Sequence, residues 1–181
     1  EYIGGRVFRL LPSGELEHLA GTGEKGYSGD GGPAVMATFN AIHNLAMRPN
    51  GDIFLSDHVN HVVRRIDAQS GKISTFAGTA KGGFSGDGGP ADQAQFNLVM
   101  CVTFSPDGKQ MIIADLSNRR IRSIDMKSGI ITTLAGSGEK GVPQDGQPAL
   151  ESPLVDPRAA AMDTKGNLYI VERNGNALRV V

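Results

Sequence analysis

A repeated sequence carries polar residues at two places, and the types of these residues could form a ligand site. One place holds an acidic residue in every copy, seven residues before an arginine. At the other place the copies differ, with histidine and asparagine in one and arginine in another. A histidine, an amide, an arginine and carboxylates can together bind a polar ligand or a divalent cation. With a histidine that follows the first acid, the predicted ligand-binding set is His43, Asn44, Asp57, His58, Asp115, Arg158 and Glu172.

The three acids of this set also have a structural interpretation. A carboxylate at a strand end often accepts the backbone N–H groups of the following turn or pairs with a nearby arginine. The sequence favours this role for Asp57, Asp115 and Glu172 and leaves ligand binding as the alternative. For the set as a whole, the alternative is a hydrated channel rim without a ligand.

Metal binding is left open by two further patterns. Asp30, Asp87 and Asp145 lie in Asp-Gly loops, where calcium is one interpretation and a turn that ties adjacent modules is the favoured one. His58 and His61 form a His-x-x-His without a third ligand in sequence, which is weak evidence for zinc. No cofactor is predicted, calcium is left open, and a metal site is left undetermined.

The elements that position these residues repeat three times along the chain. The motif reads AGTGEKGYSGDGGPA at 20–34, AGTAKGGFSGDGGPA at 77–91 and AGSGEKGVPQDGQPA at 135–149. Gly21, Gly78 and Gly136 mark the copies at intervals of 57 and 58 residues. Such a period is typical of modular folds in which each unit buries its apolar face on its neighbours.

Each period predicts four short strands. In the best copy they cover 44–47, 52–56, 62–66 and 73–77, and Pro49-Asn50-Gly51 forms the first turn. No window has the 3.6-residue periodicity of a helix. The sequence therefore predicts an all-β chain of four-stranded antiparallel meanders, and a stack of such meanders is a β-propeller.

The signature of the repeat resembles that of the NHL family. Its best copy carries Asn60-His61-Val62, Arg64 and Ile66-Asp67; the second copy matches it less closely, and the third is degenerate. The resemblance covers essentially the whole chain and implies a six-bladed ring, of which this chain would form about half. It also favours an extracellular or periplasmic location. It does not decide function, because NHL-type propellers include scaffolds, RNA binders and an amidating lyase.

The chain is predicted to be a single propeller segment with thirteen strands. Residues 1–34 form a half blade and loop, 35–91 and 92–149 form complete blades, and 150–181 form a partial blade. Closed propellers have four to eight blades. We therefore expect self-association or a longer chain, because the terminal sheets need covering.

Composition excludes several classes of partner. The 18 basic and 19 acidic residues give a net charge of −1, so the sequence predicts no nucleic-acid partner. No apolar run reaches the roughly 20 residues of a membrane helix, and no membrane span is predicted. The single cysteine, Cys101, excludes an intrachain disulfide and is expected to be a small buried residue.

The favoured function is therefore a non-catalytic propeller that binds a protein, peptide or glycan through its loops, with no catalytic residue assigned. Every strong motif is explained by the blade architecture, which favours binding over catalysis. The alternative is a metal-dependent hydrolase or lyase of the gluconolactonase-like or amidating-lyase kind, with a site in the central channel. Such a site needs residues from several blades, and about three blades supply only part of it.

Overall fold

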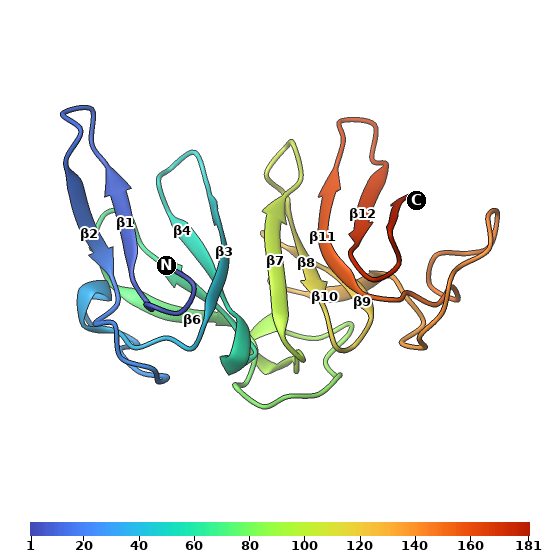
Figure 1. The fold of residues 1–181 in the computed structure, drawn as a ribbon, viewed down its shortest axis with the longest axis horizontal. Helices are drawn as coiled ribbons and strands as arrows, with labels where there is room; N and C mark the ends of the chain where they lie inside the picture. Colours follow the sequence, from blue (N-terminus) through green and yellow to red (C-terminus); the bar gives the residue numbers. More distant parts are fainter.

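The fold is an arc of four antiparallel β-sheets. The computed structural model describes residues 1–181, and its sheets contain two, four, four and three strands in chain order. Helical structure is limited to three 3₁₀ segments of three residues each. The sheets stand side by side, with β3, β7 and β11 at adjacent positions (Figure 1). The predicted all-β class and the partial propeller are confirmed, as is the number of strands.

The strands follow one another as meanders within each sheet, so every pairing joins neighbours in sequence. Their bounds are β1 (Val7–Leu10), β2 (Leu16–Ala20), β3 (Ile42–Met47), β4 (Ile53–Asp57), β5 (Val62–Ile66), β6 (Ile73–Ala77), β7 (Val99–Phe104), β8 (Gln110–Asp115), β9 (Arg120–Asp125), β10 (Ile131–Ala135), β11 (Pro157–Met162), β12 (Leu168–Glu172) and β13 (Ala177–Val180). The 3₁₀ segments are η1 (Ala34–Met36), η2 (His58–Asn60) and η3 (Ala91–Gln93).

The first strand of each blade begins earlier than the sequence predicts. β3 starts at Ile42 rather than Asn44, and the equivalent strand β7 starts at Val99. Each start follows a residue with positive φ, Ala41 at 63° and Leu98 at 63°. A register shift then interrupts the pairing. This bulge hid the strand start from the alternation pattern.

The hydrophobic core lies between the blades. Each cluster joins strands of two neighbouring sheets, and the central one joins Phe54 and Val63 of one blade to Val102 and Met111 of the next. Phe54 also packs edge-on against Phe104 of the neighbouring blade, with ring centroids 5.3 Å apart. Burial of one such large apolar side chain stabilises the fold by about 1.5–3 kcal/mol. The stacking of blades therefore supplies the main apolar stabilisation.

The repeated glycine-rich motif crosses from one blade to the next. Gly88 N–H donates to Ile131 O at 2.8 Å, and Ile131 N–H donates to Gly89 O at 3.0 Å. The first copy pairs in the same way, because Gly31 N–H donates to Ile73 O at 2.8 Å. The motif thus forms backbone hydrogen bonds with the outermost strand of the following blade, and its repetition is explained by architecture.

Two glycines of this motif differ in their surroundings, which yields a stability prediction. Gly86 and Gly88 both have positive φ, at 91° and 81°. A Cβ on Gly86 would lie 2.7 Å from the Cα and Cβ of Ala94, whereas a Cβ on Gly88 meets nothing within 4 Å. Gly88→Ala should cost about 1–2 kcal/mol of unfolding free energy from backbone strain alone, and Gly86→Ala should cost at least about 1 kcal/mol more.

Urea denaturation of both variants checks this expectation. Equal losses at the two positions would show that the loop moves away from Ala94 at no cost, contrary to the tight packing of the motif.

Candidate ligand-binding site on the loop face

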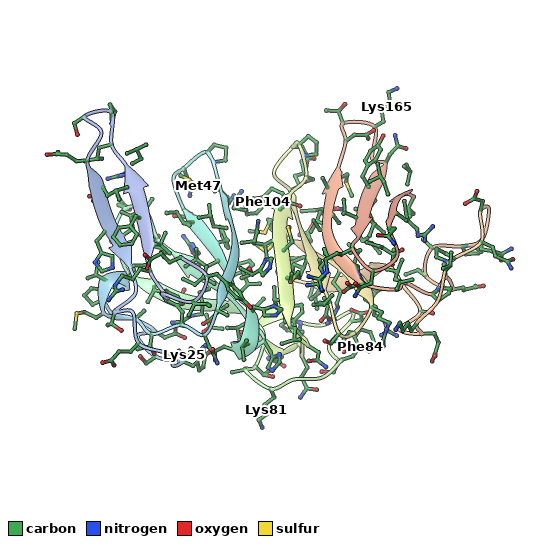
Figure 2. The ribbon with its side chains drawn as sticks, viewed as in Figure 1. Lys25, Met47, Lys81, Phe84, Phe104 and Lys165 are labelled. Atoms are coloured by element: carbon green, nitrogen blue, oxygen red, sulfur yellow. The ribbon has the colours of Figure 1, made fainter.

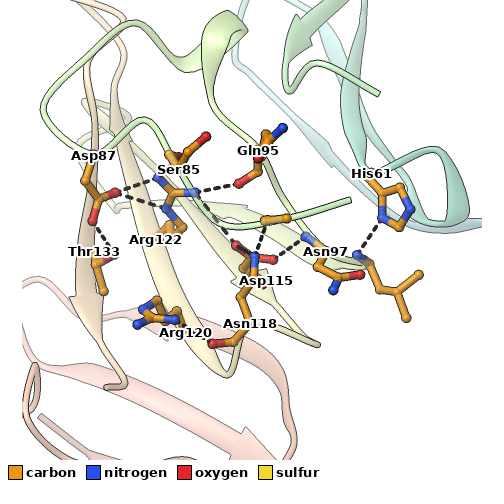
Figure 3. A network of polar contacts seen from close by, with 12 residues as sticks. His61, Ser85, Asp87, Gln95, Asn97, Asp115, Asn118, Arg120, Arg122 and Thr133 are labelled. Carbon is orange, nitrogen blue, oxygen red and sulfur yellow. Dashed lines mark hydrogen bonds and ion pairs between the residues drawn. The ribbon is translucent and has the colours of Figure 1, made fainter. Parts of the chain in front are cut away.

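Buried arginines join each complete blade to the motif that precedes it. Arg122 on β9 has a fully buried side chain, and its Nη2 donates to Asp87 Oδ1 at 2.6 Å (Figure 3). Its Nη1 lies 3.8 Å from Asp115 Oδ2. Arg64 on β5 repeats this arrangement, with its nearest contacts at 2.7 Å to Asp30 and 3.5 Å to Asp57. Each guanidinium therefore lies between a carboxylate of the motif and one of its own blade.

Aromatic rings complete the surroundings of these guanidinium groups. The Arg122 guanidinium carbon lies 5.0 Å from the ring centroid of Phe84 and 5.3 Å from that of Phe96. Arg64 is placed in the same way by Tyr27 and Phe39, at 5.0 and 5.5 Å. Cation–π contacts and paired carboxylates offset the cost of removing a guanidinium from water.

The repeated acids are held inside the blades. Asp57 accepts hydrogen bonds from the Asn40 N–H at 2.8 Å and from Asn60 Nδ2 at 2.9 Å. Asp115 accepts the matching bonds from Asn97 and Asn118, both at 2.8 Å. Burial raises the pKa of both carboxyls to about 6, although these hydrogen bonds and the arginines oppose it.

Glu172 is held in the third copy by a related but different set of contacts. It accepts the backbone N–H groups of Val155 and Asp156, and Arg179 Nε donates to it at 2.7 Å. The side chains of all three acids are fully buried. The favoured structural interpretation is therefore confirmed, because backbone N–H groups and blade arginines contact these acids. Contact of the acids with a ligand stays a prediction.

The aspartate of the Asp-Gly loop contacts the following blade in two copies out of three. Asp87 accepts a second hydrogen bond, from Thr133 Oγ1 on β10 at 2.6 Å, which confirms its predicted bridging role. Asp145 is exposed and makes no hydrogen bond or ion pair, so the same prediction is wrong there. Its copy has Val142 and Leu154 where the others have the aromatic pair. Asp30 and Asp87, for which calcium is the alternative interpretation, contact arginines.

Two of the predicted ligand-binding residues, His43 and Arg158, lie at the start of innermost strands, and His58 of η2 lies beside His43. His43, Met100 and Arg158 occupy equivalent positions on β3, β7 and β11. The ring of His43 lies 5.6 Å from that of His58, centroid to centroid, and Arg158 Nη1 donates to Met100 Sδ at 3.6 Å. We call His43, His58 and Arg158 the loop-face cluster, because it lies at the end of the blades that carries residues 57–61.

Asn44 contributes to packing between the inner strands. Its Oδ1 accepts the Val102 N–H at 2.8 Å, which joins β3 to β7. Its own N–H donates to Ser56 Oγ at 2.8 Å. Contact with a ligand stays a prediction for Asn44 and the loop-face cluster.

The histidines differ in what they contact. Nδ1 of His58 lies 3.0 Å from Val99 O; the neutral ring therefore carries its proton on Nδ1, which leaves Nε2 without a partner in the chain. His61 Nδ1 instead accepts the Leu98 N–H at 2.9 Å, so the His-x-x-His residues contact different partners. Burial is the main cause that lowers the pKa of His43 and His58, and the charge of Arg158 adds to it.

The other groups that bear on function are metal-ligating side chains and the single cysteine, Cys101. The structure contains no group of three or more His, Cys, Asp or Glu side chains suited to holding a metal ion. Cys101 is buried, as expected, and burial raises the pKa of its thiol. None of the helices is long and apolar enough to cross a membrane.

Sequence reasoning missed three neighbours of the cluster. The ring of Tyr2 lies 5.5 Å from that of His43 in an edge-on arrangement. Asp156 Oδ1 lies 3.1 Å from Arg158 Nε, and its Oδ2 lies 3.9 Å from Arg173 Nε. Asp156 stands where the other copies have alanine and leucine. This break in the repeat was a signal that could have found it, whereas Tyr2 lies outside any repeat.

Comparison with known proteins finds similarity to NHL-repeat proteins. No family model matches the sequence. The chain is 31% identical over 116 residues to Protein SUPPRESSOR OF QUENCHING 1, chloroplastic, of Arabidopsis thaliana, covering 64% of this chain and 11% of that protein. It is 23% identical over 179 residues to NHL repeat-containing protein 2 of Gallus gallus, covering 94% of this chain and 24% of the relative. It thus spans a quarter or less of these relatives.

Solved structures share the fold at low sequence identity. A protein of unknown function from Bacteroides thetaiotaomicron superposes with a TM-score of 0.76 at 22% identity, covering 98% of this chain and 42% of that one. A nidogen/laminin complex gives 0.61 at 16%, covering 99% and 54%. Virginiamycin B lyase from Staphylococcus aureus gives 0.55 at 17%, covering 98% and 45%. These likenesses establish the propeller fold.

Removal of a bridging carboxylate should destabilise the fold. Asp87→Ala removes the hydrogen bonds that Asp87 accepts from the buried Arg122 and from Thr133 Oγ1, so we expect a loss of about 1–3 kcal/mol in unfolding free energy. Asp145→Ala, the matched control, should change it by less than about 0.5 kcal/mol. Urea denaturation measures both. EDTA should leave the wild-type melting temperature unchanged, and a large decrease would instead favour calcium in these loops.

The raised carboxyl pKa values predict a pH dependence. The pKa of Asp57 is about 6 in the fold, above its ordinary value of 3.8. The folded chain therefore binds more protons between these values, and the stabilisation from this group is full below about pH 4 and is lost as the pH rises through about 6. Asp57→Asn removes this titration. Wild type should gain stability relative to the variant, by about 1 kcal/mol per pH unit at the steepest point, as pH falls from 7 to 4.

Urea denaturation of both proteins across this pH range measures the difference. If the unfolding free energy of the wild type minus that of Asp57→Asn stays constant or decreases towards pH 4, burial does not destabilise the ionised carboxylate of Asp57.

Proposed function

We propose that this chain, which has an NHL-type β-propeller fold, is a non-catalytic binding module whose loop face receives a protein, peptide or glycan ligand. The loop-face cluster of His43, His58 and Arg158 would form the centre of the contact. The observation that carries this proposal is the arrangement of residues that depart from the repeat.

Residues that repeat are used by the fold, whereas residues that differ are gathered at one place. The repeated aspartates, asparagines and arginines contact one another or the backbone. At equivalent positions of the inner strands the side chains instead change from histidine to methionine to arginine. Arginine and aromatic groups are the side chains that most often dominate binding energy in interfaces.

The chain's cysteine chemistry favours binding over thiol-based covalent catalysis. Cys101 is the chain's single thiol, and its raised pKa opposes formation of the nucleophilic thiolate. Similarity to a structure determined as a nidogen/laminin complex supports a protein ligand. Similarity to virginiamycin B lyase supports the alternative of a metal-dependent lyase, for which His43 and His58 would be the first ligands to test.

Substitutions in the cluster should weaken binding without unfolding the chain. The wild-type protein is screened on peptide and glycan arrays, and the best ligand is measured against His43→Ala and Arg158→Ala. Each substitution should raise Kd at least about tenfold, while Lys165→Ala at the far β11–β12 turn (Figure 2) should leave it unchanged. The melting temperatures should stay within about 2 °C, since His43 is exposed and Arg158 is partly exposed.

The same variants separate the two candidate functions. Unchanged binding in both cluster variants would remove the loop face from the interaction and contradict the proposal. Saturable broadening of the His43 and His58 resonances by Zn²⁺ or Mg²⁺, with turnover of a lactone or depsipeptide substrate that both variants lose, would establish the enzyme instead.

A further inference from the structure

The loop-face cluster and its neighbours Asp156 and Arg173 together carry more positive than negative charge. Arg158 and Arg173 share one carboxylate, that of Asp156, at 3.1 and 3.9 Å. One positive charge therefore remains even when both histidines are neutral. Protonation of His43 and His58 would add two more. The buried Asp57 and Asp115 do not compensate, because Arg64 and Arg122 already contact them.

The cluster is also shaped for access from outside. His43 is exposed, Arg158 retains 21% of its side-chain exposure, and Arg173 retains 68%. His58 is almost buried, but its Nδ1 donates to Val99 O, so Nε2 is the nitrogen left for a ligand, and it becomes a donor when the ring is protonated. β3 and η2 of one blade and the start of β11 of another thus place these side chains at the same end of the fold, where the rings of His43 and His58 lie 5.6 Å apart and both are influenced by the charge of Arg158.

From this geometry, we propose that the loop-face cluster binds an oxyanion group of the ligand, a carboxylate or a sulfate-type group. Nε2 of His58, the ring of His43 and the guanidinium of Arg158 would donate to it. Charge-assisted hydrogen bonds of this kind are about twice as strong as neutral ones. This inference rests on the proposed binding function and specifies the chemistry that the site recognises.

Oxyanion binding would be coupled to protonation. In the free protein, burial, mutual repulsion of the rings and the charge of Arg158 lower the pKa of His43, and burial and Arg158 lower that of His58. The ring of Tyr2 packs on His43, and His61 interacts with His58. The Asp156 carboxylate contacts Arg158 and Arg173. A bound anion would oppose the repulsion and raise both pKa values, so affinity should increase as the pH falls.

Imidazole NMR of the wild-type chain tests the proposal directly. The four histidines are titrated from pH 8 to 5.5 in NaCl, and then at the same ionic strength with sodium sulfate or sodium acetate. We expect saturable shifts of His43 and His58 with at least one anion. Kd should rise by up to about tenfold per pH unit above the histidine pKa values. A response to sulfate alone indicates a sulfate-type group, and a response to acetate indicates a carboxylate.

Two controls separate a built site from general charge effects. His18 lies on β2, away from the cluster, and should not respond. Arg158→Gln should weaken binding at least about tenfold, whereas Lys165→Gln, which removes the same charge from the same blade, should change Kd less than about twofold. If Arg158→Gln unfolds, His43→Asn replaces it. Equal shifts at His18 and the cluster, equal effects of the two charge removals, or no saturable response would overturn the proposal.

The outcome is independent of the macromolecular ligand. Anion binding without any array ligand would contradict the binding-module function while leaving the oxyanion site in place. If an array ligand binds through the cluster but neither anion gives a response, the binding-module function is supported and the oxyanion site is contradicted.

Discussion

The fold depends on a fully buried guanidinium held between two carboxylates. In each complete blade one carboxylate comes from the preceding glycine-rich motif and the other from the end of the second strand. The same aspartate at the strand end accepts a backbone N–H from the segment that enters its blade. The asparagine three residues later donates to Gly26 O or Gly83 O of the motif. One charged network therefore fixes the position of three segments, and removing any member would leave a buried charge without a partner.

Apolar packing and this network have different effects on the arc. The clusters between sheets remove large side chains such as Phe54 and Met111 from water and stabilise the stack. Apolar contacts are non-directional, so they tolerate sliding of one blade on another, whereas the hydrogen bonds of Arg122 do not. The third copy illustrates the difference: its apolar contacts persist, but Asp145 has no partner and Gly175 replaces the asparagine.

Architecture and recognition use separate residues. The arginine network occupies the interior of each complete blade, as Figure 3 shows for Arg122. His43 and Arg158 of the loop-face cluster lie at the start of innermost strands. Because the β3, β7 and β11 positions are about one period apart in sequence, one substitution per repeat is enough to change the chemistry of the common face. A ring of repeated modules can therefore acquire a binding site without altering what holds the modules together.

The sequence alone determined the strands, the turns and the stacking of blades, because these follow from local alternation, turn chemistry and the period. The spacing of seven between acid and arginine also indicated their pairing, since both lie on adjacent antiparallel strands. Only the tertiary structure decided that Asp57, Asp115 and Glu172 are buried, because neighbouring loops cover the strand ends. It also brought Tyr2 to His43, through a contact between residues far apart in sequence, which no local pattern encodes.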